Sequence, residues 1–115
     1  MTDVDAVLEA NAAFYRAFES LEAARMEAVW LRAPHITCVH PGWRLLAGWG
    51  PVMESWGRIF ESTLGMRFTL AGVRAEVRGD VAWVILTEGI ESRHHDGRVE
   101  AQVEATNLFE RRDGR

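Results

Sequence analysis

The first part of the chain carries apolar residues at helical spacing. They share one face of a helix, at Val7, Phe14, Phe18 and Leu21. Asn11 interrupts this apolar stripe. Thr2 and Asp5 have the spacing of a capping box, in which each side chain accepts a hydrogen bond from the backbone of the other residue. The pattern predicts an amphipathic helix over 2–19.

A second helix and a short hairpin are predicted next. Ser20 can cap a helix over 21–31, which must end before Pro34 because proline disfavours helical geometry in the preceding residue. The β-branched segment 35–40 predicts a strand that ends at a Pro-Gly pair. A second short strand over 44–47 can pair back on it.

A third helix is predicted from Pro51, a residue that suits the first turn of a helix, to Gly65. Its apolar positions fit a period of 3.6 residues. They are Val52, Trp56, Ile59, Phe60 and Thr63.

The rest of the chain has the pattern of a meander of long strands. Three tight-turn pairs stand 17 residues apart, at 79–80, 96–97 and 113–114. The strands between them are therefore about 14 residues long, against a usual length of roughly five or six. Gly72 and Gly89 lie inside these strands, close to opposite one another, and a glycine there commonly marks a bulge or a bend.

We therefore predict one α+β domain over 1–115. Three N-terminal helices pack on a strongly curved, mainly antiparallel sheet, a half-cone around an apolar pocket. Segment 82–90 is apolar on both faces, so we expect a second copy to cover the convex face. The turn at 113–114 has no returning strand, which leaves the edge of 98–110 unpaired. We expect that a last strand is missing and that the chain is a truncated form.

Composition narrows the classes of function. The 115 residues carry a net charge of -4 and scattered arginines, so we expect neither a nucleic-acid partner nor a membrane partner. Cys38 is the one cysteine, and His35 and His40 lie on opposite faces of a strand, so we expect no metal and no cofactor. The chain shows no signal-peptide pattern and no membrane-spanning run, which indicates a cytoplasmic protein.

Three segments resemble the SnoaL-like branch of the nuclear transport factor 2 superfamily. They are 38–43, 55–60, and 105–109 followed by the turn before Arg115. The order of the predicted elements is also that of this superfamily. The resemblance implies a cystatin-like half-cone with a ligand pocket. The superfamily includes ketosteroid isomerases, dehydratases, polyketide cyclases and noncatalytic association domains, so the fold alone assigns no function.

The resemblance suggests where acid–base chemistry could lie. His40 stands where similar isomerases carry a catalytic aspartate base, and imidazole exchanges protons near neutral pH. Tyr15 corresponds roughly to the tyrosine that donates to an oxyanion in those isomerases. The position of their protonated aspartate falls near Thr106 or Asn107, and because neither is a carboxylic acid, we do not expect a true steroid isomerase.

Each candidate also has a structural interpretation. His40 can be a strand-end histidine bonded to a loop, although alternation groups it with Ile36 and Cys38 on the expected pocket face. Tyr15 can pack its ring while its hydroxyl meets solvent. Glu88 interrupts an apolar strand, so its carboxylate lies either in the pocket with a raised pKa or beside an arginine.

Trp43 and Trp49 flank the short strand near the expected pocket rim, and an aromatic rim suits a flat apolar ligand. The candidate ligand-binding residues are Trp30, Cys38, Trp43, Trp49, Trp56, Phe60 and Thr106. Trp56, at helical spacing, fits a core position better.

Two functional hypotheses remain. In the first, the pocket binds a small apolar carbonyl compound and performs cofactor-free isomerase-, cyclase- or dehydratase-type chemistry. His40 then moves the proton, Tyr15 polarises the carbonyl, and Asn107 or Glu88 assists. In the second, the chain is a noncatalytic homodimerisation domain. Its candidate interface residues are Trp83, Ile85 and Val103.

Overall fold

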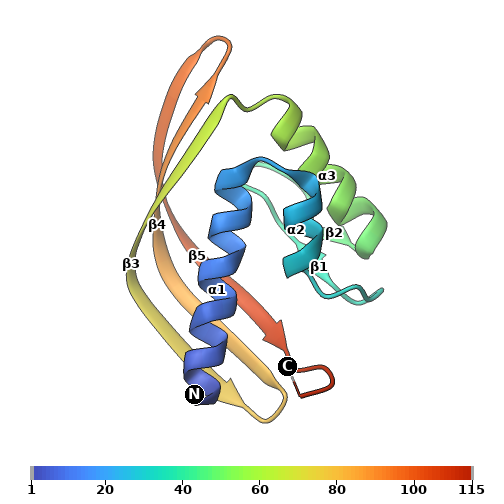
Figure 1. Cartoon of the computed structure of the whole chain (residues 1–115). Helices are drawn as coiled ribbons and strands as arrows, with labels where there is room; N and C mark the ends of the chain where they lie inside the picture. The colour runs from blue at the N-terminus through green and yellow to red at the C-terminus, as the bar shows by residue number, and fades with distance from the viewer. Residues whose placement is uncertain (1, 115) are drawn as a thin grey trace.

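The computed structural model describes residues 2–114 and shows helices packed on an antiparallel sheet, which confirms the α+β prediction (Figure 1). The helices are α1 (Asp3–Ser20), α2 (Ala23–Val29) and α3 (Trp49–Glu61). The strands are β1 (Thr37–Cys38), β2 (Leu46–Ala47), β3 (Gly65–Arg78), β4 (Val81–His94) and β5 (Gly97–Glu110). None of the helices in this described part is long and apolar enough to cross a membrane.

The helix boundaries differ from the predictions at three places, each for a local reason. The capping box of Thr2 and Asp5 is present, but Leu21 ends α1 with a positive φ of 57°, so α2 begins later than predicted. Ser20 does not cap α2: its Oγ donates to a carbonyl of α1 and accepts from the backbone of Glu22. Helix α3 begins before Pro51 and ends at Glu61, so the residue predicted to end it starts β3 instead.

The long meander follows the prediction closely. Strands β3, β4 and β5 are 14 residues each, pair in the order β3-β4-β5, and curve around α1 (Figure 1). The β3–β4 register shifts between Ala71 and Arg74, where Gly72 has a φ of 61°. A bulge at a left-handed glycine bends the strand, as the sequence predicts. Gly89 lies opposite Thr69, three residues along β3 from Gly72, so the two glycines are not directly opposed.

The hairpin strands are much shorter than predicted. The strand expected over 35–40 narrows to β1, which pairs with β2 as a separate two-stranded sheet. Within residues 2–114, β5 pairs with β4 alone.

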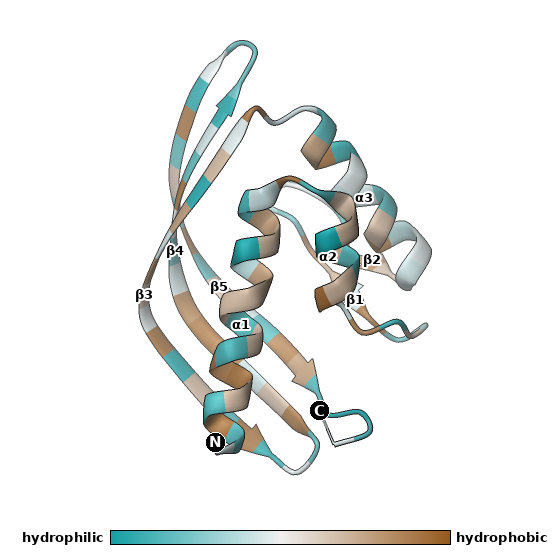
Figure 2. Cartoon of the chain, viewed as in Figure 1, coloured by the Kyte–Doolittle hydropathy of each residue, from teal (hydrophilic) through white to brown (hydrophobic). Residues whose placement is uncertain are grey.

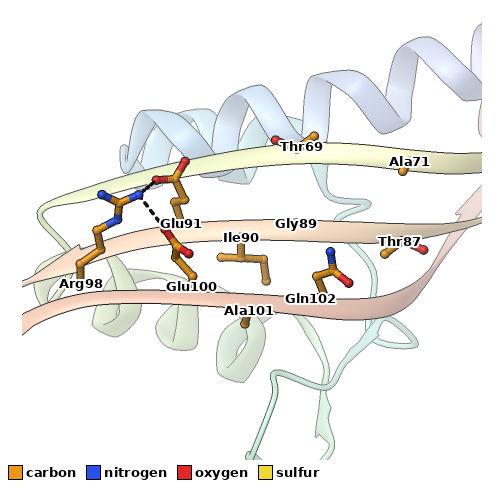
Figure 3. A pocket seen from close by; sticks show the side chains of 10 residues that line it. All are labelled: Thr69, Ala71, Thr87, Gly89, Ile90, Glu91, Arg98, Glu100, Ala101 and Gln102. Carbon is orange, nitrogen blue, oxygen red and sulfur yellow. Dashed lines mark hydrogen bonds and ion pairs between the residues drawn. The ribbon is translucent and has the colours of Figure 1, made fainter.

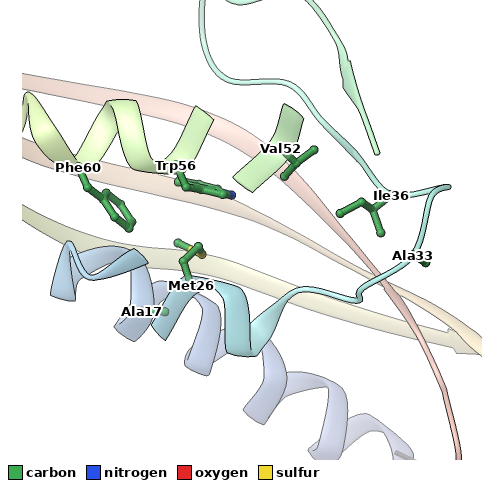
Figure 4. Close-up of a cluster of buried hydrophobic side chains, with 7 residues drawn as sticks. All are labelled: Ala17, Met26, Ala33, Ile36, Val52, Trp56 and Phe60. Atoms are coloured by element: carbon green, nitrogen blue, oxygen red, sulfur yellow. The ribbon is translucent and has the colours of Figure 1, made fainter. Parts of the chain in front are cut away.

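Two apolar clusters hold the helices and the sheet together. The first lies among the helices and centres on Met26, Val52 and Trp56, each at most 2% exposed (Figure 4). The second joins α1 to the sheet through Tyr15, Val84 and Leu86. Even-numbered residues of β4 therefore point toward α1, on what we call the inner face, and odd-numbered ones lie on the outer face. Figure 2 shows hydrophobic segments of the sheet beside α1 and a hydrophilic tip on the β4–β5 hairpin.

Candidate functional site

Four polar side chains meet on the inner face of the sheet beneath α1, and we call them the inner polar cluster: Asn11, Tyr15, Glu88 and Asn107. Tyr15 donates its hydroxyl hydrogen to Glu88 Oε2. Asn107 Nδ2 donates to Tyr15 Oη at 3.1 Å and to Asn11 Oδ1 at 2.9 Å. The structure thus brings together three of the four predicted acid–base residues, and it leaves out His40.

Local structure explains why these residues meet. Asn11 and Tyr15 lie one helical turn apart, so both point from α1 toward the sheet. Glu88 is an inner-face residue of β4 because alternate residues of a strand share a face, and Val84 and Leu86 are buried on that face. Asn107 lies opposite Val84 in the β4–β5 register, which puts its side chain on the same face.

The charge of the Glu88 carboxylate is not balanced by a cation among residues 2–114. It is half-buried, and no cation of residues 2–114 lies within salt-bridge distance of it, so the arginine pair considered above is not formed in this part of the chain. Burial raises the pKa of Glu88, and the hydrogen bond from Tyr15 opposes that shift. Burial and the neighbouring Glu88 raise the pKa of Tyr15, so the phenol stays protonated.

His40 belongs to a separate cluster between the β1 end and α3. Its side chain is 6% exposed and its ring packs edge-on against Trp43 and Trp56, at centroid distances of 5.1 and 4.7 Å. Ser55 gives its hydroxyl hydrogen to the carbonyl of Val52, so Ser55 Oγ accepts the bond from His40 Nε2 at 2.9 Å. The partner is therefore a helix side chain rather than a loop. Burial lowers the pKa of His40, which favours the neutral ring.

Cys38 lies beside this histidine. Its Sγ is 3.6 Å from His40 Nε2. Burial raises the pKa of the thiol to about 11, so the sulfur stays protonated and unreactive near neutral pH. Alternation along the strand predicts both side chains on one face, but it does not predict their contact.

The other predicted ligand-binding residues lie in different places. Trp30, Trp56 and Phe60 pack in the helical cluster. Trp49 stacks with Arg32 at 5.0 Å, and Thr106, opposite Ile85, lies on the outer face. The site therefore does not gather these residues around one ligand surface.

Two open depressions lie away from both clusters. One of about 580 Å³ lies on the outer face around Gly89, where Arg98 pairs with Glu91 and Glu100 (Figure 3). The other, about 410 Å³, is lined by the α3 N-terminus and by residues 32–34. Neither is lined by a residue of the inner polar cluster. No group of three or more His, Cys, Asp or Glu residues in the range 2–114 is placed to hold a metal ion.

Asn11 belongs to the inner polar cluster but was not predicted as a functional residue. It is 2% exposed, although an asparagine rarely lies so deep without hydrogen-bond partners. The available signal was the polar interruption of an apolar stripe one helical turn before Tyr15. A polar residue at such a position indicates a buried hydrogen-bond network.

Replacing His40 with Asn should flatten the fall in stability on acidification. Because the folded-state pKa is lowered, the unfolded chain binds a proton below about pH 6.5 that the folded protein does not, so stability falls as pH drops through that value. Urea denaturation at several pH values between about 7.5 and 5.5 measures the slope. The exposed His95→Asn is the control. An unchanged slope in the His40 variant would show that the imidazole is not held neutral.

A comparison with known proteins finds a matching family and several similar structures. The profile of the family described as SnoaL-like domain matches residues 7–115. A solved candidate dehydratase of the NTF2-like family from Streptomyces avermitilis is 38% identical, with a TM-score of 0.90 over 96% of this chain and 86% of that chain. A candidate calcium/calmodulin-dependent protein kinase type II association domain from Thiobacillus denitrificans is 29% identical, with a TM-score of 0.77 over 90% of this chain and 82% of that one.

A curated relative is much longer than this chain. The F-box protein SKIP8 of Arabidopsis thaliana is 27% identical over 110 residues, which are 96% of this chain and 45% of that protein. The chain thus spans less than half the length of this relative.

Proposed function

Because this chain belongs to the family of SnoaL-like domains, we propose that its inner polar cluster is a small-molecule site where Glu88 transfers a proton to or from an apolar carbonyl compound. One observation carries the proposal. Glu88 is a half-buried carboxylate that Tyr15 holds by a hydrogen bond and that no cation of residues 2–114 neutralises. Such a charge destabilises a fold, and groups in these environments concentrate at functional sites.

The geometry suggests roles for three members of the cluster. Glu88 Oε1, the oxygen that Tyr15 does not bond, takes the proton from the carbon next to the carbonyl. Tyr15 positions the carboxylate: its single hydroxyl hydrogen is directed to Glu88, so it does not polarise the carbonyl while Glu88 is ionised. The side-chain amide of Asn11 can donate to the carbonyl oxygen on which negative charge develops.

The inner-face residues of β5 form an apolar surface beside this cluster. Val103, Ala105 and Phe109 are half-buried and share the face of Asn107, while α1 packs mainly on β3 and β4. An apolar ligand body can lie along this surface. Similarity to a candidate dehydratase supports the chemistry, because elimination of water from a carbonyl compound begins with the same proton abstraction.

Proton exchange into ketones tests the proposal without knowledge of the natural substrate. The protein is incubated in deuterated water with a panel of cyclic and aromatic ketones, and deuterium at the carbon beside the carbonyl is followed by NMR. We expect exchange faster than in buffer, lost in Glu88→Gln and retained in Glu104→Gln, the same change on the outer face of the neighbouring strand. Equal exchange by the parent and Glu88→Gln would refute the proposed role.

A second candidate function is homodimerisation through the outer face of the sheet. Ile85 and Leu108 are 43% and 71% exposed there, and the half-buried Trp83 lies opposite Leu108. Similarity to an association domain supports this candidate. Val103 lies opposite Glu88 on the inner face, so it does not belong to the interface that the sequence suggested.

Sedimentation velocity over a range of concentrations tests this second function. We expect Leu108→Arg to shift the protein toward monomer, because a charge at an apolar contact is left unpaired. Val103→Thr, a mild change on the other face, is the control. A parent protein that stays monomeric at all concentrations would exclude the dimer.

A further inference from the structure

Three polar atoms of the inner polar cluster have no hydrogen-bond partner among residues 2–114. They are Asn11 Nδ2, Glu88 Oε1 and Asn107 Oδ1. They are not sealed in the core, because the fully enclosed side-chain polar atoms without a partner in this range are the indole nitrogens of Trp30 and Trp56. Each of the three atoms therefore keeps some surface that solvent can reach, although Asn11 as a whole is 2% exposed.

The number of hydrogens on the Tyr15 hydroxyl and on the Asn107 amide determines which of these atoms donate and which accept. Tyr15 has one hydroxyl hydrogen and gives it to Glu88, so Tyr15 Oη must accept from the Asn107 amide nitrogen. The second hydrogen of that nitrogen goes to Asn11 Oδ1. Asn107 thus cannot turn its amide over without losing the bond to Tyr15 Oη, which has no hydrogen left to give. Its oxygen stays directed away from both hydrogen bonds as an acceptor, and Asn11 keeps its own amide nitrogen as a donor.

We propose that the ligand carries, besides its carbonyl, a hydroxyl group that donates to Asn107 Oδ1. The inference rests on the proposed function and adds the substrate class: an apolar hydroxy-carbonyl compound. The open atoms are two acceptors and one donor. A simple ketone satisfies the donor of Asn11 and leaves Asn107 Oδ1 without a partner once the ligand displaces water, which costs binding free energy. A hydroxyl hydrogen removes that cost.

The role of Asn107 differs from the one the sequence suggested. At this position a donor was expected, in place of the protonated aspartate of similar isomerases. Both hydrogens of Asn107 are committed within the protein, so only its oxygen remains for a ligand. Asn107 is in this way a specificity-determining residue, and Asn11 and Tyr15 are the positioning residues that set its orientation.

Three compounds that differ at a single group test the inference: β-hydroxypropiophenone, propiophenone and β-methoxypropiophenone. Their dissociation constants are measured by isothermal titration calorimetry with the parent protein. We expect the hydroxy ketone to bind about tenfold more tightly than either of the others, since the methoxy compound fills the space without a donor. Equal binding of all three would overturn the inference and leave the proposed function standing, while no binding by any of them would overturn both.

A variant of Asn107 tests whether this residue causes the preference for the hydroxy ketone. In Asn107→Leu the hydroxy and methoxy ketones should bind with equal affinity, whereas Thr106→Val, next in the chain and on the outer face, should keep the preference. A preference that persists in Asn107→Leu would overturn the assignment. Should that variant not fold, the side-chain amide hydrogens of Asn107 in the parent decide by NMR: slow exchange of both supports the fixed amide, and fast exchange of either contradicts it.

Discussion

Replacing Trp56 with Ala should remove about 3–5 kcal/mol from the free energy of unfolding, the usual range for deleting a buried aromatic ring. Trp56 is 2% exposed, and its ring contacts Phe14, Phe18, Trp30 and Phe60 at centroid distances of 4.8 to 6.1 Å. It therefore joins α1 and α3 to the residue that follows α2. Because small domains have total stabilities of roughly 5–15 kcal/mol, the loss should be visible as a large shift of the urea midpoint.

Two control variants test whether the loss of stability in Trp56→Ala comes from lost packing. Trp56→Phe keeps a ring and removes an indole N–H that has no acceptor among residues 2–114, so it should cost less than half as much. Trp43→Ala removes a tryptophan that is 39% exposed and should change stability by about 1 kcal/mol or less. If Trp56→Ala and Trp43→Ala proved equally mild, the helical cluster would not be the main support of the fold.

The Glu88→Gln variant should be inactive and more stable than the parent. Glutamine keeps an oxygen that accepts from Tyr15, yet it cannot take a proton, so ketone exchange should fall at least about a hundredfold. At neutral pH the variant also avoids an uncompensated half-buried charge, and the gain should be on the order of 1 kcal/mol. A gain in stability with a loss of exchange is the expected pattern for a group retained for chemistry.

The pH dependence of stability gives this prediction a definite sign. The folded-state pKa of Glu88 lies above its unfolded value, so the folded protein binds a proton that the unfolded chain has already lost. Stability therefore falls as pH rises from the unfolded pKa to the folded one. In Glu88→Gln that fall should disappear, while Glu104→Gln should retain it. A variant less stable than the parent at neutral pH would show that the carboxylate is favourably paired.

The elements of the fold could be predicted because each pattern reflects one dominant force. Even spacing of the turns set the length of β3, β4 and β5, and the capping box set the start of α1. Boundaries that depend on a local conformation were missed. A left-handed φ at Leu21 ends α1, and within the segment 35–40 the pairing with β2 is confined to Thr37 and Cys38, so β1 is short.

The site was predicted in part for a similar reason. The alternation of side chains along a strand identifies Glu88 and Asn107 as inner-face residues once the register is known. Which side chains touch across α1 and the sheet depends on packing distances that no local pattern contains. His40 shows this limit, because Phe14 and Trp56 fill the space between it and Tyr15.

Because β3 carries one extra residue at Gly72, the residues that face α1 are odd-numbered on one side of this glycine and even-numbered on the other. On one side of it the odd-numbered Ala75 packs against the cluster of Tyr15, Val84 and Leu86, whereas on the other side the even-numbered Leu70 and Phe68 do so. Losing one residue there would turn Phe68 out to solvent and bring the charged Arg67 beneath α1. Insertions and deletions in this strand should therefore be tolerated only in pairs, and related chains should differ here by two residues or by none.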